Sequence, residues 1–387
     1  IYDGYVNSIL GGSNATIEAQ GKVIGNTNIV CYGNSYDIYG GSAGIINGTT
    51  INTNTGLITG DTNITLNNSS EVVNIHGGGY NCGVTGTANI NINNGSVEEI
   101  YGGAYQNQVQ TATNINIYGG MVGQNIYGGN ELTTQDQLNS DNSSQNTNIV
   151  IGRANEDTRP LVLGNIYGSG KYDRIGTAEI HLIESANKIS TVYGGSDTAG
   201  ITNEANIYLN GMTASTIYGG SNTDGTVTNS NIYLQSGTVT DVYGGGYGGT
   251  TTTSNVNMEG TANVTSIYGG SNTNGTVGTS NVELKSGTLL NVYGGGNSAS
   301  VGTANVNLDG LTIDSIHGGS KTAGVTTNTN VVLNSGTVTN AFGAGYGVGA
   351  INAKVTQNGA KVTNIYGGNE GGDNDSSETT NSIVNIK

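Results

Sequence analysis

One motif constrains the fold of this 387-residue chain more than any other feature: a hydrophobic residue, an aromatic residue or histidine, and a pair of small residues. It occurs thirteen times, most often as I-Y-G-G, and from Tyr167 onward at steps of 24 to 26 residues. A fixed period of this kind is typical of solenoids, in which each repeat buries its apolar face only by stacking on its neighbours. The second position of the motif, here called the aromatic position, is occupied by Tyr39, His76, Tyr101, Tyr127, Tyr167, Tyr193, Tyr218, Tyr243, Tyr268, Tyr293, His317, Phe342 and Tyr366, with a degenerate copy at Leu10.

Each repeat contains alternating segments that predict short strands. Residues 254–258 read Ser-Asn-Val-Asn-Met, which places Val256 and Met258 on one face of a strand. A second apolar pair follows a turn, as in Val239 and Val242, and its three-residue spacing predicts a bend. A third short run follows the glycine pair and includes the valines Val227, Val277, Val301 and Val325.

Three short strands per coil describe a parallel β-helix, and the wealth of β-branched residues supports it. We therefore predict an all-β, right-handed parallel β-helix of about 14 coils of about 25 residues. We expect a single β-helix domain over residues 1–387. The two long intervals between motifs predict inserted loops at about 44–62 and 130–163, and insertions in solenoids gather on one face, often the binding face.

Composition narrows the classes of partner. The formal net charge is −16 with only 11 Lys and Arg, which argues against nucleic acid and anionic membranes. No apolar run is long enough to span a membrane, so we expect no membrane insertion. Neutral glycans, cations and other proteins, including further copies of this chain, remain as partner classes. The cysteines Cys31 and Cys82 lie in different parts of their repeats, which disfavours a mutual disulfide.

Two positions that recur in the repeat have structural explanations. The glycine pair fits a tight corner that needs positive φ or close backbone approach at every level. Asparagine stands just before the first inward residue of the leading strand in eleven coils, with Glu179 and Lys354 as exceptions, and stacked amides can bond along the coil axis. These asparagines are Asn28, Asn63, Asn89, Asn114, Asn148, Asn206, Asn231, Asn255, Asn281, Asn305 and Asn330.

The orientation of the tyrosines decides between two interpretations. If the hydrophobic residue before each tyrosine faces the core, alternation places the rings outside in a flat file suited to stacking on sugar rings. If the corner turns both residues inward, the rings form a buried or half-buried stack with solvated hydroxyls. The outward interpretation makes these tyrosines candidate ligand-binding residues: Tyr101, Tyr127, Tyr193, Tyr218, Tyr243, Tyr268 and Tyr293.

The second inserted loop adds basic candidates. Arg153, Arg159, Lys171 and Arg174 cluster in an otherwise acidic chain and are candidate ligands for an acidic sugar or a partner's carboxylates. The simpler interpretation is a set of solvated charges that balance Glu156, Asp157 and Asp173.

Catalytic patterns are scarce. No G-x-S-x-G, H-E-x-x-H or Cys-His cluster occurs, so we name no catalytic residue and lean against an enzyme. The acidic stretch with Glu370, Asp373, Asp375 and Glu378 lacks EF-hand spacing, which favours a solvated loop. We therefore expect no cofactor and no resident metal, and leave calcium as an alternative without a motif.

With these repeats, the chain from about Ile9 to Tyr366 resembles the I-Y-G-G-repeat regions of large exported adhesin-like proteins of anaerobic, mostly Gram-positive bacteria. More distantly it resembles the pectate-lyase-like β-helix superfamily. The resemblance implies an extracellular, secreted or surface-attached module that adheres to a polysaccharide such as the plant cell-wall glucan cellulose. Alternatives are a filament subunit assembled end to end or by strand donation, and, by fold analogy, a polysaccharide lyase or glycoside hydrolase.

Overall fold

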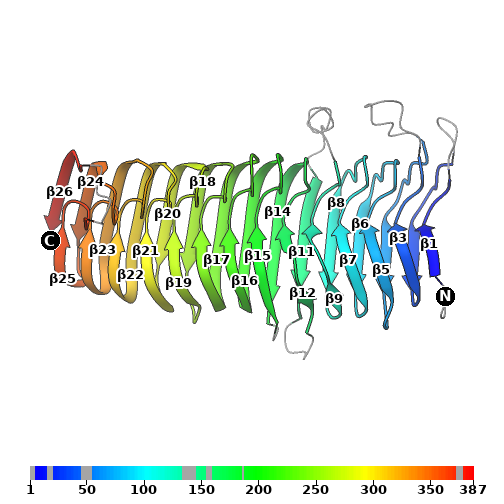
Figure 1. Cartoon of the computed structure of the whole chain (residues 1–387), viewed down its shortest axis with the longest axis horizontal. Coiled ribbons are helices and arrows are strands. Elements are labelled where there is room, and N and C mark those ends of the chain that lie inside the picture. Colours follow the sequence, from blue (N-terminus) through cyan, green and yellow to red (C-terminus); the bar gives the residue numbers. More distant parts are fainter. Residues whose placement is uncertain are drawn as a thin grey trace. The chain divides into compact units, whose positions relative to one another are not determined.

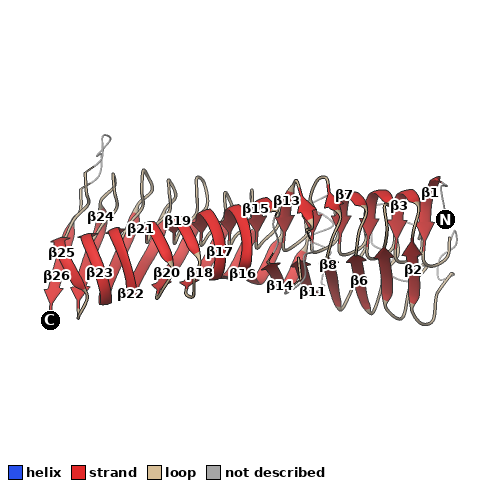
Figure 2. Ribbon diagram, turned by 90° about the horizontal axis from the view of Figure 1, so that it is seen from below, coloured by secondary structure: helices blue, strands red, loops and turns tan. Residues whose placement is uncertain are grey.

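The computed structural model describes residues 5–14, 21–44, 55–132, 145–153, 159–184, 187–371 and 378–387. In these ranges every regular element is a β-strand and every strand pairing is parallel, as Figures 1 and 2 show. The chain forms a right-handed parallel β-helix of about 14 coils of about 25 residues, which confirms the predicted fold. It comprises two compact units, Ile1–Asn203 and Glu204–Lys387.

In the first unit, two columns of strands stack coil upon coil. The leading strands are β2 (Thr27–Cys31), β4 (Thr62–Leu66), β6 (Thr87–Ile92), β8 (Ala112–Ile117), β11 (Gln145–Ile151) and β14 (Arg174–Ile183). The second column runs β1 (Tyr5–Leu10), β3 (Asn34–Tyr39), β5 (Glu71–His76), β7 (Ser96–Tyr101), β9 (Met121–Val122) with β10 (Ile126–Tyr127), β12 (Leu161–Val162) with β13 (Asn165–Tyr167), and β15 (Lys188–Tyr193). The split of this strand into two pieces in two coils lies at the predicted bend.

The strands of the second unit are β17 (Thr226–Tyr243), β18 (Thr250–Met258), β19 (Asn263–Tyr268), β20 (Thr276–Leu284), β21 (Thr288–Tyr293), β22 (Val301–His317), β23 (Thr326–Phe342), β24 (Ala350–Gln357), β25 (Lys361–Tyr366) and β26 (Asn381–Ile386). Of these, β17, β22 and β23 are long enough to pair with strands of both columns. Strand β16 (Ile201–Tyr218) contains the boundary between the units.

The core follows the predicted alternation. In β18, Val256 and Met258 are fully buried, whereas Asn255 and Asn257 between them are only partly buried. Val239 and Val242 are also fully buried, as predicted from their spacing. Successive coils place like residues opposite one another, so that apolar side chains stack in files.

Three of the four valines named in the third run are buried. Val227, Val277 and Val301 are 0 to 2% exposed, but Val325 is 50% exposed. Register explains the difference, because Val301 pairs with Thr326, and Thr326 occupies the interior position instead.

The glycine pairs are required by close backbone approach. The Gly102 N–H donates to the Tyr127 carbonyl of the next coil at 2.8 Å. A methyl group on Gly102 would overlap the carbonyl oxygen of Gly128. The corner is also tied to the leading strand, since Thr113 donates its hydroxyl to the Gly128 carbonyl at 2.5 Å.

The asparagine row forms an amide ladder on each unit. Asn89 donates its side-chain amide to Asn63 at 3.0 Å, and Asn114 donates to Asn89 at 2.8 Å. The same pairing recurs in the second unit, as from Asn255 to Asn231 at 2.8 Å. These contacts confirm the structural interpretation of the row.

Both cysteines are buried free thiols. Cys82 donates to the Ser42 carbonyl at 3.0 Å and accepts from the Ser42 N–H at 3.1 Å. Burial raises the pKa of the Cys82 thiol to about 12, so this side chain is unreactive in the folded state. Most of the two predicted inserted loops, at 45–54, 133–144 and 154–158, lies outside the described residues.

Candidate functional site: the turn row above an aromatic ladder

The residues at the aromatic position stack on one another in each unit and form an aromatic ladder. Neighbouring ring centroids are 4.8 to 5.0 Å apart from Tyr39 through His76, Tyr101, Tyr127 and Tyr167 to Tyr193. In the second unit they are 4.6 to 5.1 Å apart from Tyr218 to Tyr366. This spacing is that of adjacent strands, so ring stacking follows directly from in-register coils.

The structure selects the inward orientation of the tyrosines. The side chains from Tyr39 to Phe342 in the ladder are 1 to 7% exposed, and only Tyr366 reaches 45%. Ile100 and Tyr101 are both buried because the strand ends there and the glycine corner turns the chain. The outward interpretation, with free ring faces, is therefore corrected for Tyr101, Tyr127, Tyr193, Tyr218, Tyr243, Tyr268 and Tyr293.

A second row of side chains lies at the open edge of the ladder. We call it the turn row, and it consists of the fourth residue after each aromatic position. Its members are Ala43, Tyr80, Tyr105, Glu131, Lys171 and Asp197 in the first unit, and Asn222, Tyr247, Asn272, Asn297, Lys321, Tyr346 and Glu370 in the second. In each unit the turn row thus combines aromatic, acidic and basic groups, and in the second unit it also contains amides.

Tyrosines of the turn row stand edge-on against the ladder ring of the preceding coil. Their centroids lie 5.2 to 6.1 Å from that ring, at interplanar angles of 75 to 89°. Tyr80, Tyr247 and Tyr346 remain 37 to 42% exposed. The ladder therefore fixes these tyrosines while leaving part of each ring to solvent.

Polar members of the turn row reach further, to the ladder side chain two coils earlier. The pairs are Glu131 with His76, Lys171 with Tyr101, Asp197 with Tyr127, Asn272 with Tyr218, Lys321 with Tyr268, and Glu370 with His317. The distances are 2.5 to 3.3 Å. The hydroxyls and imidazoles of these six ladder residues are consequently bonded to turns.

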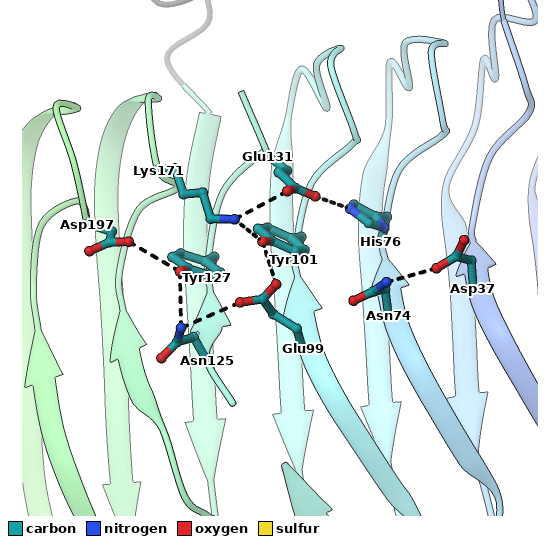
Figure 3. A network of polar contacts seen from close by, with 10 residues as sticks. All are labelled: Asp37, Asn74, His76, Glu99, Tyr101, Asn125, Tyr127, Glu131, Lys171 and Asp197. Atoms are coloured by element: carbon teal, nitrogen blue, oxygen red, sulfur yellow. Dashed lines mark hydrogen bonds and ion pairs between the residues drawn. The ribbon is translucent and has the colours of Figure 1, made fainter. Parts of the chain in front are cut away.

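Around Tyr101 these contacts join into a continuous network, shown in Figure 3. Lys171 donates from Nζ to the Tyr101 hydroxyl at 2.5 Å and to Glu131 at 3.3 Å. Tyr101 donates to Glu99 at 2.8 Å, and Glu131 accepts from His76 Nε2 at 2.8 Å. The Lys171 ammonium also lies 4.9 Å from the Tyr101 ring centroid, within cation–π range.

The same arrangement around histidine occurs in both units. His76 is 2% exposed, stacks on Tyr101, meets Tyr105 edge-on and bonds Glu131. His317 is 2% exposed, stacks on Phe342, meets Tyr346 edge-on, and bonds Glu370 at 2.7 Å. Each histidine therefore holds the turn two coils further on by a hydrogen bond to the glutamate of that turn.

Burial and charge set the protonation states here. Burial alone would raise the pKa of Glu131, but the hydrogen bond and charge of His76, together with Lys171, outweigh it and lower the pKa. Burial lowers the pKa of His317 despite its contact with Glu370. Burial, then Glu131 and Glu99, raise the pKa of Tyr101 far above 10. The network accordingly holds a carboxylate and neutral phenols at neutral pH.

The predicted basic residues do not form one cluster with the ladder. Lys171 is the member brought to Tyr101 and Tyr127, whereas the guanidinium of Arg153 lies 3.9 Å from the centroid of the Tyr118 ring. The Arg159 carbonyl accepts from Asn187 Nδ2 at 3.0 Å, and the Arg174 N–H donates to Asp173 at 2.9 Å.

Asp173 itself corrects an expectation. It is 0% exposed, so it is an interior carboxylate and not the solvated charge that was expected. Glu156 and Asp157, the other proposed counter-charges, lie outside the described residues, as do Asp373 and Asp375 of the acidic stretch.

In the described ranges, no group of three or more His, Cys, Asp or Glu side chains is placed to hold a metal ion. The same ranges contain no helix with the length and apolar character needed to cross a membrane. Comparison with protein-family models, curated proteins and solved structures finds no match to this chain.

Sequence reasoning missed the histidine–glutamate pairs. The signal was available, because the same Tyr-Gly-Gly-Asn-Glu sequence ends at Glu131 and at Glu370, in each case two motifs after a histidine at the aromatic position. What the sequence did not reveal is that the turn leans back across two coils, which brings residues 53 to 55 positions apart into contact.

Proposed function

We propose that this chain is a non-catalytic adhesion module, located outside the cell, that binds an extended neutral polysaccharide through its turn row. The observation that carries the proposal is the set of partly exposed tyrosines Tyr80, Tyr247 and Tyr346, held edge-on by the ladder among amide and charged groups. Aromatic rings with neighbouring hydrogen-bonding groups are suited to the apolar faces and hydroxyls of sugars.

Ring stacking within the ladder decides which tyrosines can contact a sugar. The faces of Tyr101 are covered by His76 and Tyr127 at 4.8 Å each, so no sugar ring can stack on Tyr101. The same holds for interior members of the ladder in each unit. Sugar contacts are therefore assigned to the turn row, with ladder residues in a supporting position.

Charge favours a neutral polymer. The chain carries a net charge of −16, and Glu131 is kept ionised in the turn row by His76 and Lys171. A polyanion approaching this edge would be repelled at low salt, whereas a glucan such as cellulose would not. The sequence resemblance to exported adhesin-like repeat proteins supports the same class of function and the extracellular location.

A pull-down on insoluble cellulose tests the proposal. The triple variant Tyr80→Ala, Tyr247→Ala, Tyr346→Ala should lower the bound fraction by roughly fivefold or more, since each stacked ring contributes about 1 kcal/mol. The matched control is the double variant Tyr32→Ala, Tyr36→Ala, because these tyrosines are 45 and 46% exposed but lie outside the turn row.

The control should bind as the unchanged protein does, and circular dichroism should show both variants folded. Absence of binding of the unchanged protein to cellulose and to other insoluble neutral glucans would contradict the proposal, as would equal loss in the control. The filament and the lyase or hydrolase alternatives remain predictions from the sequence.

A further inference from the structure

The turn row is interrupted once in the first unit by a side chain too small to continue it. Tyr80 and Tyr105 stack with their centroids 4.9 Å apart and their planes 14° from parallel, so Tyr105 covers one face of Tyr80. On the other side the preceding turn lies alongside, since the Tyr80 N–H donates to the Ser42 carbonyl at 3.0 Å. The turn-row residue of that preceding coil is Ala43, which has no ring to stack on Tyr80.

The aromatic ladder also lacks a ring next to Ala43, at Leu10 of the preceding coil. Leu10 pairs in register with Tyr39 and stands where an aromatic side chain would continue the stack. Because neither Ala43 nor Leu10 carries a ring, a cleft of about 290 Å³ lies here, lined by Ser8, Leu10, Asp37, Tyr39, Ala43 and Tyr80. The cleft thus has the place and the walls of a missing tyrosine.

The walls of the cleft combine apolar and polar groups. Tyr39 meets Tyr80 edge-on, with centroids 5.2 Å apart, so the two rings form a corner. Asp37 is partly buried, and its Oδ1 accepts from Asn74 Nδ2 at 2.9 Å, which orients the carboxylate. An ionised carboxylate has about four lone-pair sites, so it can accept hydroxyl hydrogens besides this amide.

We propose that this cleft binds one neutral pyranose ring, which stacks on Tyr80 in the position that a tyrosine at residue 43 would take. The apolar face of the sugar lies against Tyr80, its edge lies over Leu10 and Tyr39, and its hydroxyls donate to Asp37. A volume of about 290 Å³ suits one such ring and not an extended oligosaccharide. The inference rests on the proposed function and deepens it, because it locates one sugar-binding subsite.

Cellobiose is the probe, with binding measured by saturation-transfer difference NMR and calorimetry on the full chain. We expect a dissociation constant in the millimolar range, as for a small ligand held by one ring and a few hydrogen bonds. Ala43→Tyr restores the missing rung and should weaken cellobiose binding by roughly tenfold or more, because the introduced ring occupies the site.

Two further variants keep the test independent of folding defects. Asp37→Asn retains an acceptor for Asn74 but removes the charge, and should weaken cellobiose binding by roughly threefold to tenfold. Ala323→Tyr makes the same substitution at an exposed turn position of the second unit, outside the turn row, and should leave cellobiose binding unchanged. Glucuronic acid should bind more weakly than glucose because of the Asp37 carboxylate.

The outcomes separate the subsite from the general function. Undiminished cellobiose binding by both Ala43→Tyr and Asp37→Asn would overturn the proposed subsite. It would also be overturned if the unchanged protein bound phenol but not cellobiose, and Ala43→Tyr abolished the binding of phenol. If the unchanged protein binds cellulose but not cellobiose, the subsite is contradicted and the proposed function is not. If it binds cellobiose at the cleft but does not bind cellulose, the proposed function is contradicted and the subsite is not.

Discussion

A ladder tyrosine is held both by its faces and by its hydroxyl. Tyr101 is 1% exposed, has a ring on each side, and shares its hydroxyl between Lys171 and Glu99. The ring supplies buried area and stacking, and the hydroxyl connects the ladder to the turns. These two contributions can be separated by substitution.

Tyr101→Ala should lower the free energy of unfolding of the first unit by about 3–5 kcal/mol, the range for loss of a buried aromatic ring. Tyr101→Phe should cost only about 1–2 kcal/mol, because it keeps the ring and removes the hydroxyl. Urea unfolding followed by circular dichroism measures both. Tyr36 is the control, because its side chain is 46% exposed, and Tyr36→Ala should leave the free energy of unfolding nearly unchanged. Equal losses of stability for Tyr36→Ala and Tyr101→Ala would contradict a buried ladder.

The interior carboxylate of Asp173 is balanced by hydrogen-bond donors. It accepts from the Asn130 N–H at 2.6 Å, from Gln145 Nε2 at 3.0 Å and from the Arg174 N–H at 2.9 Å. An amide in its place would turn an NH₂ group toward these donors. The site therefore discriminates between two side chains of nearly equal shape.

Asp173→Asn should destabilise the first unit by about 2–3 kcal/mol, because a buried polar group then faces donors instead of accepting from them. The matched change Asp314→Asn, at an exposed strand position, should stay within about 0.5 kcal/mol. Thermal unfolding of the two variants decides the matter. A neutral Asp173→Asn would mean that the carboxylate is not the acceptor described here.

At the scale of the coil, periodicity predicted most of the fold and the register explains the rest. The alternation that buries Val256 and Met258 and the amide ladder through Asn89 both follow from repetition alone. Val325 belongs to the third apolar run by its place in the repeat, but a shift of one residue puts Thr326 at the interior position instead. The turn row could not be predicted in this way, because its contacts depend on how far a turn leans across neighbouring coils.

Coil stacking depends on the absence of a side chain at the first glycine of each corner. Gly102→Ala should cost about 2–3 kcal/mol, since the added methyl overlaps the Gly128 carbonyl and two coils must move apart. Gly368→Ala is the control within the same motif, because its nearest neighbour would be Thr379 Oγ1 at 3.7 Å. Urea midpoints should differ clearly between the two variants; similar midpoints would contradict close packing at Gly102.

The histidine of the second unit adds a pH dependence. Burial lowers the pKa of His317 in the folded state below the ordinary value of 6.5, so the unfolded chain binds more protons as pH falls. The stabilisation from neutral His317 is therefore complete above pH 6.5 and is lost as pH falls from 6.5 toward the lower folded pKa.

His317→Phe should remove this part of the pH dependence, since the neighbouring coil already accommodates Phe342 at the aromatic position. Unfolding midpoints between about pH 7.5 and 5.5 should fall less steeply in the variant than in the unchanged protein. A variant with the same slope as the unchanged protein would show that His317 does not bind protons differently in the two states.

At the scale of the whole chain, the two units use the same construction. Each contains an aromatic ladder, an amide ladder and one buried histidine tied to a glutamate by a turn. Repetition fixes the scaffold in both, while the variation permitted at the turn row sets the chemistry of the edge. The sugar-binding proposal depends on this division, because it requires rigid turns above covered rings.

Spectrophotometric titration of the tyrosines tests the buried ladder most directly. Tyrosine in water ionises near pH 10, whereas burial raises the pKa of Tyr39, Tyr101, Tyr127, Tyr167, Tyr243 and Tyr293 well above that value. Since the unfolded chain loses these protons first, their contribution to stability is complete below pH 10 and is lost as pH rises further. We expect a first, reversible phase smaller than that of the 22 tyrosines in urea, with the remainder ionising only as circular dichroism reports unfolding. Ionisation of all 22 in one reversible phase near pH 10, with native circular dichroism, would contradict it.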